Sequence, residues 1–402
     1  MLITDLLSRQ FIYIKDTGGI FMKKSLLLVG AFLTVAAMAQ AKEVVPEPVV
    51  VEEAPVQVVE KEIIVYRDKE EGFRPNGYVD LQYRWYGDTE GQNEDIGDAP
   101  KDSTAWNKAN NYSRVQLQGK INMTENQSLE YRIRTYDELD KEEERINKSG
   151  TETRLRYFYN HGYLGDSKVN LTSRVHYKNN GHDDNSQELE YQARFNFAEY
   201  MFNNDYIKTT DFTVAPKYGY SWGNDNSSDY DNQLGVDLYT FHELPWGFTT
   251  EFNVYATQHF YGQDQYFDGV DKKDDKNFTV DVEAYLYHTL PLYANGNLSI
   301  DFNNEGGYDA YNWSAEKKFG TAHKDGKYAN DLKETDKGVG KNNSKYEAYL
   351  LSTVQANYQV TPNFLVYAAA GAEYRDWTNN SDSSASNWRW QPTAFAGFKT
   401  TF

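Results

Sequence analysis

Eight arginines occupy alternate positions in short segments whose intervening residues are mostly apolar. In residues 79–85, for example, the odd positions are Val79, Leu81, Tyr83 and Trp85, whereas Arg84 is at an even one. Side chains two residues apart share one face of a β-strand, so the arginines are expected opposite the apolar face. The arginines with this phase are Arg84, Arg114, Arg132, Arg134, Arg154, Arg156, Arg174 and Arg194.

Six carboxylates have the corresponding phase in later segments, namely Asp237, Glu251, Asp281, Glu283, Asp301 and Glu347. If both sets point inward, an arginine-rich wall faces a carboxylate-rich wall. Charged rows lining an aqueous passage set its selectivity, so such walls would order water and favour small polar solutes. The alternative is that the arginines pair locally with Glu130, Glu152 and Glu190 and fill the interior.

Catalytic and metal-binding patterns are weak in this sequence. None of the seven histidines lies in a Gly-x-Ser-x-Gly or His-Glu-x-x-His motif. The best remaining pair for acid–base chemistry is His259 with Asp264. An acidic loop lacks the ligand spacing of a calcium site; its carboxylates are Asp268, Asp271, Asp274 and Asp275. We expect no enzymatic activity, no metal and no cofactor.

The elements that must position the charged residues are strands, because the same alternation recurs along the chain. It predicts an all-β fold, a transmembrane antiparallel up-and-down β-barrel of about fourteen strands. Late strands are expected at 298–302 and 346–358. No segment after the leader is apolar for about 18 residues, which excludes helical membrane spans. A soluble β-sandwich, which also alternates, is the competing interpretation.

The links between the expected strands are alternately short and long. Short links include 123–126, 291–296 and 361–363, whereas the longest link is 305–343. Short turns at one rim and long loops at the other are typical of outer-membrane barrels, so we expect periplasmic turns and extracellular loops. The longest link either folds into the lumen or is exposed outside, and its polar composition favours exposure.

The start of the chain contains a candidate export signal. Lys23 and Lys24 precede an apolar run that ends in Ala39-Gln40-Ala41, the pattern of a cleaved signal peptide at 22–41. Residues 1–21 have no targeting pattern, so we expect translation to start at Met22; an extended leader is the alternative. A Pro/Val/Glu-rich periplasmic segment is expected at 42–73, followed by the barrel at 74–402.

Composition agrees with an exported barrel. The net charge of -19 argues against nucleic acid as a partner, since phosphate binding needs clustered Lys and Arg. Aromatic residues make up 15% of the chain and include 33 tyrosines, which we expect in girdles at the membrane interfaces. The chain has no cysteine, so its stability cannot come from disulfides.

The last segment resembles the signal by which the barrel-assembly machinery recognises its substrates. Phe398 and Phe402 share one face of an alternating segment, and Phe402 is the terminal residue. We therefore expect these two residues to act in assembly, with outer-membrane lipid and lipopolysaccharide around the inserted barrel.

Several segments together resemble the major outer-membrane porin family of fusobacteria. They are Lys42-Glu-Val, Val65-Tyr66-Arg67-Asp68, Pro75-Asn76-Gly77, the run from Gln82 to Gly87, Arg154-Leu-Arg156, the run from Leu164 to Val169, and the ending Phe398 to Phe402. The resemblance implies passive diffusion of ions and small hydrophilic solutes, a homotrimer, and loops that contact other cells. An adhesin or structural barrel with a closed lumen is the alternative, and an outer-membrane hydrolase a third.

Overall fold

This computed structural model describes residues 72–92, 110–136, 150–181, 186–223, 229–267, 273–321, 340–376 and 388–402. The expected leader at 1–21 and signal peptide at 22–41 lie outside these residues, as does most of the segment 42–73. All the described residues belong to one compact unit, Asp68–Phe402.

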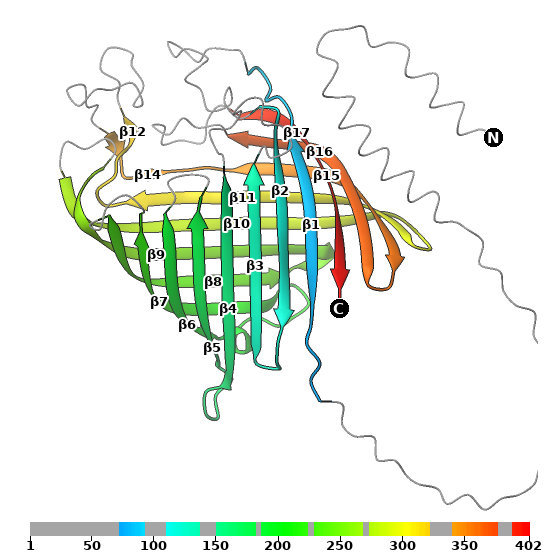
Figure 1. Cartoon of the computed structure of the whole chain (residues 1–402), viewed down its shortest axis with the longest axis horizontal. Coiled ribbons are helices and arrows are strands. Elements are labelled where there is room, and N and C mark those ends of the chain that lie inside the picture. The colour runs from blue at the N-terminus through cyan, green and yellow to red at the C-terminus, as the bar shows by residue number, and fades with distance from the viewer. Residues whose placement is uncertain are drawn as a thin grey trace, which may run out of the picture. The chain divides into compact units, whose positions relative to one another are not determined.

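The segments with alternating residues form long antiparallel strands that close into a ring. Within the described residues, fourteen strands make up the ring, each hydrogen-bonded to its neighbours (Figure 1). They are β1 (Asn76–Tyr86), β2 (Tyr112–Asn122), β3 (Gln127–Tyr136), β4 (Thr151–Tyr163), β5 (Asn170–Asn180), β6 (Gln187–Asn196), β7 (Lys208–Trp222), β8 (Tyr230–Glu243), β9 (Phe248–Tyr266), β10 (Lys273–Asn295), β11 (Leu298–Ser314), β15 (Tyr349–Thr361), β16 (Phe364–Asp376) and β17 (Trp388–Thr401). The predicted all-β, up-and-down antiparallel barrel is confirmed.

Short elements accompany the ring. They are β12 (Phe319–Thr321), β13 (Gly340–Asn342), β14 (Ser344–Lys345), and the 3-10 turns η2 (Ala198–Tyr200) and η3 (Pro245–Gly247). β12 pairs with β13, and β14 pairs antiparallel with the end of β11 at Asn312 and Trp313. Among the residues that the structure describes, no helix has the length and apolar character needed to cross a membrane.

The ring closes where β1 pairs with β17. The register places Leu81 beside Phe398 and Trp85 beside Ala394. At the end of this seam the Gly77 N–H donates to the Phe402 carbonyl at 3.1 Å, and the Phe402 N–H donates to the Gly77 carbonyl at 3.2 Å. The last strand therefore completes the barrel.

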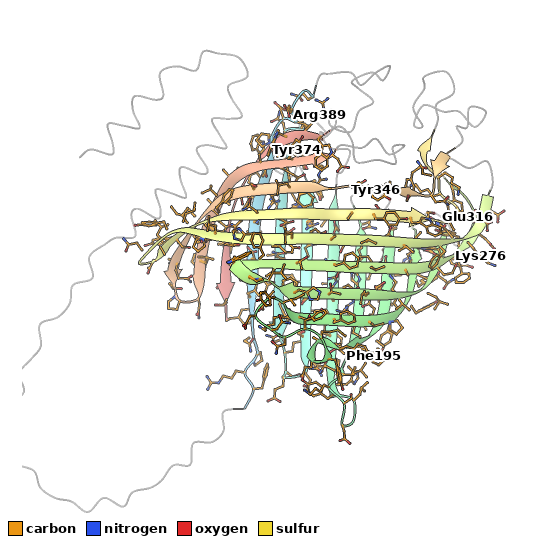
Figure 2. All side chains as sticks on the ribbon, turned by 180° about the vertical axis from the view of Figure 1, so that it is seen from behind. Phe195, Lys276, Glu316, Tyr346, Tyr374 and Arg389 are labelled. Atoms are coloured by element: carbon orange, nitrogen blue, oxygen red, sulfur yellow. The ribbon has the colours of Figure 1, made fainter. Side chains whose placement is uncertain are left out.

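The links between ring strands alternate between the two ends of the barrel, as expected. Figure 2 shows Phe195, close to the turn-bearing end, far from Tyr374 and Arg389 at the end with the longer links. Two expected boundaries beside β11 are wrong. Residues 291–295 continue β10, and the turn lies at Gly296, whose positive φ of 57° suits a tight reversal. Residues 305–314 continue β11 rather than starting a loop.

Burial in the barrel is inverted relative to a water-soluble domain. The most deeply buried large side chains include Gln192 and Asp237, whereas Leu189 and Leu234 are 49% and 52% exposed. Exposed apolar side chains recur on strand after strand, which produces a continuous apolar outer surface. A surface of this kind is stable against lipid rather than water.

Candidate functional site

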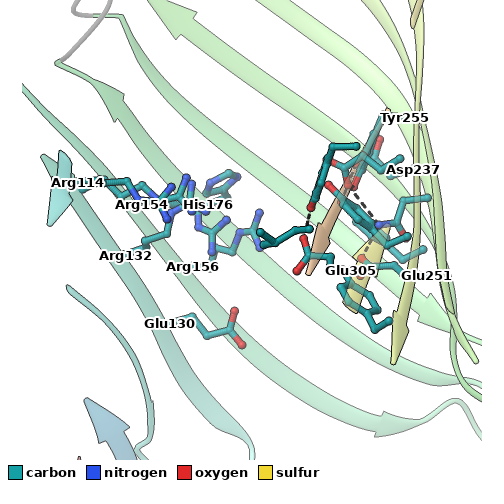
Figure 3. A pocket seen from close by; sticks show the side chains of 18 of the residues that line it. Arg114, Glu130, Arg132, Arg154, Arg156, His176, Asp237, Glu251, Tyr255 and Glu305 are labelled. Carbon is teal, nitrogen blue, oxygen red and sulfur yellow. Dashed lines mark hydrogen bonds between the residues drawn. The ribbon is translucent and has the colours of Figure 1, made fainter. Parts of the chain in front are cut away.

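The interior of the barrel contains a cavity of about 1070 Å³. Its lining is contributed by strands from both sides of the ring and is dominated by charged and tyrosine side chains. Figure 3 shows Arg114, Arg132, Arg154 and Arg156 gathered on one side, with carboxylates and Tyr255 on the other. This interior is the candidate functional site.

All eight arginines singled out in the sequence lie in the cavity lining, and we call this set the arginine wall. Strand alternation is the cause. Leu155 and Val175, next to Arg154 and Arg174 in the chain, are 37% and 40% exposed on the outer surface. Because neighbouring side chains on a strand point to opposite faces, the arginines point inward.

The arginine wall contains like-charged neighbours at directly opposed positions. Arg84 lies across from Arg114 between β1 and β2, and Arg132 across from Arg154 between β3 and β4. Like charges at such positions destabilise a sheet. A wall built this way therefore concentrates positive potential at some cost to stability, which is typical of functional surfaces.

Some arginines pair with carboxylates on their own wall. Arg132 donates to Glu152 at 2.5 Å, and Arg174 donates to Glu190 at 2.6 Å. Glu130, the third expected partner, accepts instead from Lys120 at 3.2 Å. Local pairing therefore accounts for only part of the arginine wall.

Arg154 and Arg156 differ from these paired arginines. Within the described ranges, neither guanidinium makes a hydrogen bond or an ion pair, although both line the cavity. Arginine stays protonated in proteins, so both side chains present full positive charge to the lumen.

A buried ionic cluster joins the two sides of the cavity. Lys217 Nζ lies 2.8 Å from Asp237 Oδ1 and 3.8 Å from Glu190, while Gln192 donates to the other carboxylate oxygen of Asp237 at 2.6 Å. The Arg194 guanidinium lies over the Tyr239 ring, 4.2 Å from its centroid. Lys217 was missed in the sequence, although its phase in β7 could have identified it.

Three of the six expected acidic residues line the cavity: Asp237, Glu251 and Glu283. The other three do not. Asp281 accepts a hydrogen bond from its cross-strand partner Asn312 at 2.9 Å, and Asp301 accepts one from Asn357 at 2.8 Å. Glu347 precedes β15, since that strand begins at Tyr349 rather than at 346, and it pairs with Lys345 at 2.5 Å.

The carboxylates on the second side are held by neutral donors. Tyr255 donates to Glu283 at 2.6 Å, and Asn253 donates to Glu251 at 2.6 Å. Glu305, which was assigned to a loop, lines the cavity and accepts from Tyr349. We call Glu251, Glu283 and Glu305 the glutamate wall; in the described part of the chain none of them forms an ion pair.

Many tyrosines lie inside the barrel rather than in the expected girdles. Those in the cavity lining are Tyr86, Tyr112, Tyr136, Tyr239, Tyr255, Tyr285, Tyr287 and Tyr349. Their hydroxyl groups supply donors to buried carboxylates without adding positive charge. Glu373 and Arg375 also line the cavity and pair at 2.5 Å, and both were missed.

The candidate catalytic pair is not formed. His259 contacts Asp231 at 2.7 Å instead of Asp264, and its other ring nitrogen contacts the Thr279 hydroxyl at 3.1 Å. These contacts connect β8, β9 and β10. Asp268 and Asp271 lie outside the described residues, within which no cluster of His, Asp and Glu is arranged to hold a metal ion.

The terminal phenylalanines lie at the seam. The Phe398 ring packs 5.6 Å from that of Phe364 on the adjacent strand, and Phe402 is 54% exposed. Phe402, which follows the last residue of β17, is therefore accessible at the end of the seam.

No protein-family model and no curated protein sequence matches this chain. Its structure is similar to a bacterial polysaccharide outer membrane secretin, with TM-score 0.35 and 11% identity over 81% of this chain and 97% of that chain. The outer membrane channel DcaP of Acinetobacter baumannii gives TM-score 0.34 and 11% identity over 82% and 96%. An anion-selective porin from Comamonas acidovorans gives TM-score 0.28 and 7% identity over 82% and 99%. All three scores are below 0.5, so the fold is established by the chain's own strand pairing.

Proposed function

We propose that this chain is a general diffusion porin of a bacterial outer membrane. It passes ions and small hydrophilic solutes through a water-filled lumen lined by charged side chains. The observation that carries the proposal is the closed barrel with an apolar outer surface and a charged internal cavity of about 1070 Å³. Such a surface suits lipid, and such an interior suits water.

Unpaired charges inside the barrel support a hydrated lumen. Removing an ionised side chain from water without a partner costs roughly several kcal/mol of free energy. Arg154 and Arg156 make no hydrogen bond or ion pair with the described residues, although the charge of Glu130 acts on both, and hydration in the lumen would stabilise their guanidinium groups. A barrel that served only as a scaffold would be more stable with these positions paired or apolar.

We also propose how the protein is exported, assembled and partnered. The signal peptide at 22–41 directs secretion, the segment 42–73 lies in the periplasm, and Phe398 and Phe402 are read by the barrel-assembly machinery. Because several of its segments resemble that family, we assign the protein to the fusobacterial major porin family. It forms a homotrimer in outer-membrane lipid and lipopolysaccharide. Its loops contact other cells.

Two measurements on the purified full-length protein test the pore. In planar bilayers we expect stepwise conductance in KCl, and in liposomes we expect swelling whose rate falls as the sugar becomes larger. A barrel with a closed lumen, such as an adhesin, would give neither signal. Heat-denatured protein at the same detergent concentration is the control.

A further inference from the structure

Each wall of the cavity lacks counter-charges: the arginine wall has too few carboxylate partners, and the glutamate wall has no cationic partner among the described residues. On the arginine wall, Arg154 and Arg156 make no ion pair among the described residues, and the buried Nε of Arg156 has no hydrogen-bond partner there. Their neighbours Arg132 and Arg174 are neutralised by Glu152 and Glu190. Arg154 and Arg156 are thus left to bind an anionic group from outside the protein.

The glutamate wall has the complementary deficiency. Asn253 donates to Glu251 at 2.6 Å and to Glu283 at 3.4 Å, and Tyr287 donates to Glu251 at 3.3 Å. These neutral donors fix the carboxylates in position but do not cancel their charge. The glutamate wall is therefore left to bind a cationic group.

Both walls border the same cavity, and Figure 3 shows the labelled arginines facing Glu251 and Glu305 across it. Its volume of about 1070 Å³ is just above the usual range for small-molecule sites, roughly 300–1,000 Å³. An amino acid or a short peptide fits within that space.

We propose that the cavity binds zwitterions, namely amino acids and short peptides with free termini, during their passage. The solute carboxylate pairs with Arg154 and Arg156, and the solute ammonium group lies toward Glu251, Glu283 and Glu305. This assignment rests on the proposed function, because it requires an open lumen.

Charge complementarity favours this class over simple ions. An anion bound to the arginine wall also meets the potential of the glutamate wall, and a cation meets the reverse. A zwitterion gains from both walls at once. Guanidinium–carboxylate pairs are among the stronger hydrogen bonds because both partners are charged, and they can be bidentate.

The test uses four solutes of nearly equal size added to single channels of the full-length protein. They are triglycine, N-acetyl-triglycine as the anion, triglycine amide as the cation, and N-acetyl-triglycine amide as the neutral form. We expect triglycine to interrupt the KCl current with residence times about tenfold longer than those of the other three. Liposome swelling with the same four solutes measures their relative permeation without any substitution.

Two variants assign the walls. In R154Q/R156Q, triglycine should lose its advantage over the amide, and in E251Q/E283Q/E305Q it should lose its advantage over the acetylated anion. The matched control K168Q/K208Q removes two positive charges from side chains that are 64% and 54% exposed at the turn-bearing end. It should leave the ranking unchanged.

The outcomes separate this inference from the pore itself. Equal residence times for all four solutes in a conducting channel, or the longest times for the anion or the cation, would overturn zwitterion binding and leave the porin intact. Absence of conductance in KCl would overturn both. Variants are compared only when their folded form migrates as wild type without heating, and the wild-type ranking stands as a test by itself.

Discussion

The arginine wall and the glutamate wall differ in how their buried charges are stabilised. On β2–β6, arginines lie opposite one another, and salt bridges such as Arg174 with Glu190 neutralise only some of them. On β9–β11, tyrosine and asparagine donors hold Glu251, Glu283 and Glu305 without any counter-charge from the described residues. A lumen can thus keep net charge on both sides while the hydrogen bonds of only one side are satisfied.

The largest loss of stability is expected at Arg174, an arginine of the wall that forms a buried salt bridge. Arg174 and Glu190 are 5% and 7% exposed, so R174Q leaves a buried carboxylate whose next cation, Lys217, is 3.8 Å away. We expect the free energy of unfolding in lipid vesicles to fall by about 3 kcal/mol, as for other broken buried pairs. The matched variant R154Q removes an unpaired arginine of the same wall, and an equal loss there would remove the distinction between paired and unpaired arginines.

Ion preference should change when the arginine wall is neutralised. In R132Q/R134Q/R154Q/R156Q the lumen loses four positive charges, and we expect the cation-to-anion permeability ratio to rise about fivefold. The reversal potential of single channels in a KCl gradient measures this ratio. If conductance and ion preference stay at wild-type values, the arginine wall serves structure alone.

The opposite shift is expected from the glutamate wall. E251Q/E283Q/E305Q keeps acceptors for the tyrosine and asparagine donors but removes three negative charges, and the same ratio should fall about threefold. The control E199Q/E243Q changes carboxylates that are 47% and 48% exposed. A shift of equal size in that control would mean that charge outside the cavity sets the preference.

The smallest effect is expected at His259, where hydrogen bonds join three strands beside the carboxylate side of the lumen. T279V removes one bond to the histidine ring, and we expect a loss of about 0.5 kcal/mol in unfolding free energy with conductance unchanged. T279S, which keeps a hydroxyl, should behave as wild type. Hydrolytic activity of the wild-type protein that disappears in T279V would revive the enzyme alternative.

Strand phase predicted the barrel and the position of the arginines because β2–β6 alternate cleanly, with Leu155 and Val175 marking the outer face. Phase failed where alternation is lost. Glu373 follows a run of Leu, Val, Tyr and Ala on both faces of β16, so its direction could not be read. Glu305 was assigned to the start of the longest link, whereas the backbone continues as strand through Gly306 and Gly307.

The hydrogen-bond partners of the side chains could not be predicted from the sequence for a different reason. The contact between Glu305 and Tyr349 joins residues 44 positions apart, and that between Gln192 and Asp237 spans 45. Such pairs depend on the stagger between strands, which the two-residue repeat does not specify. The same holds for the tyrosines, whose amphipathic side chains suit either an interface or a hydrated interior.

The seam between β1 and β17 has a consequence for biogenesis. Tyr78 pairs with Thr401 in the ring, so closure joins the two strands that are farthest apart in the chain. Until then, one edge of β1 presents unpaired N–H and C=O groups, a template for pairing with other chains. Contacts of such long sequence separation form slowly. The nascent barrel therefore needs protection of an open edge, and the rate of insertion should depend on β17 more than on any interior strand.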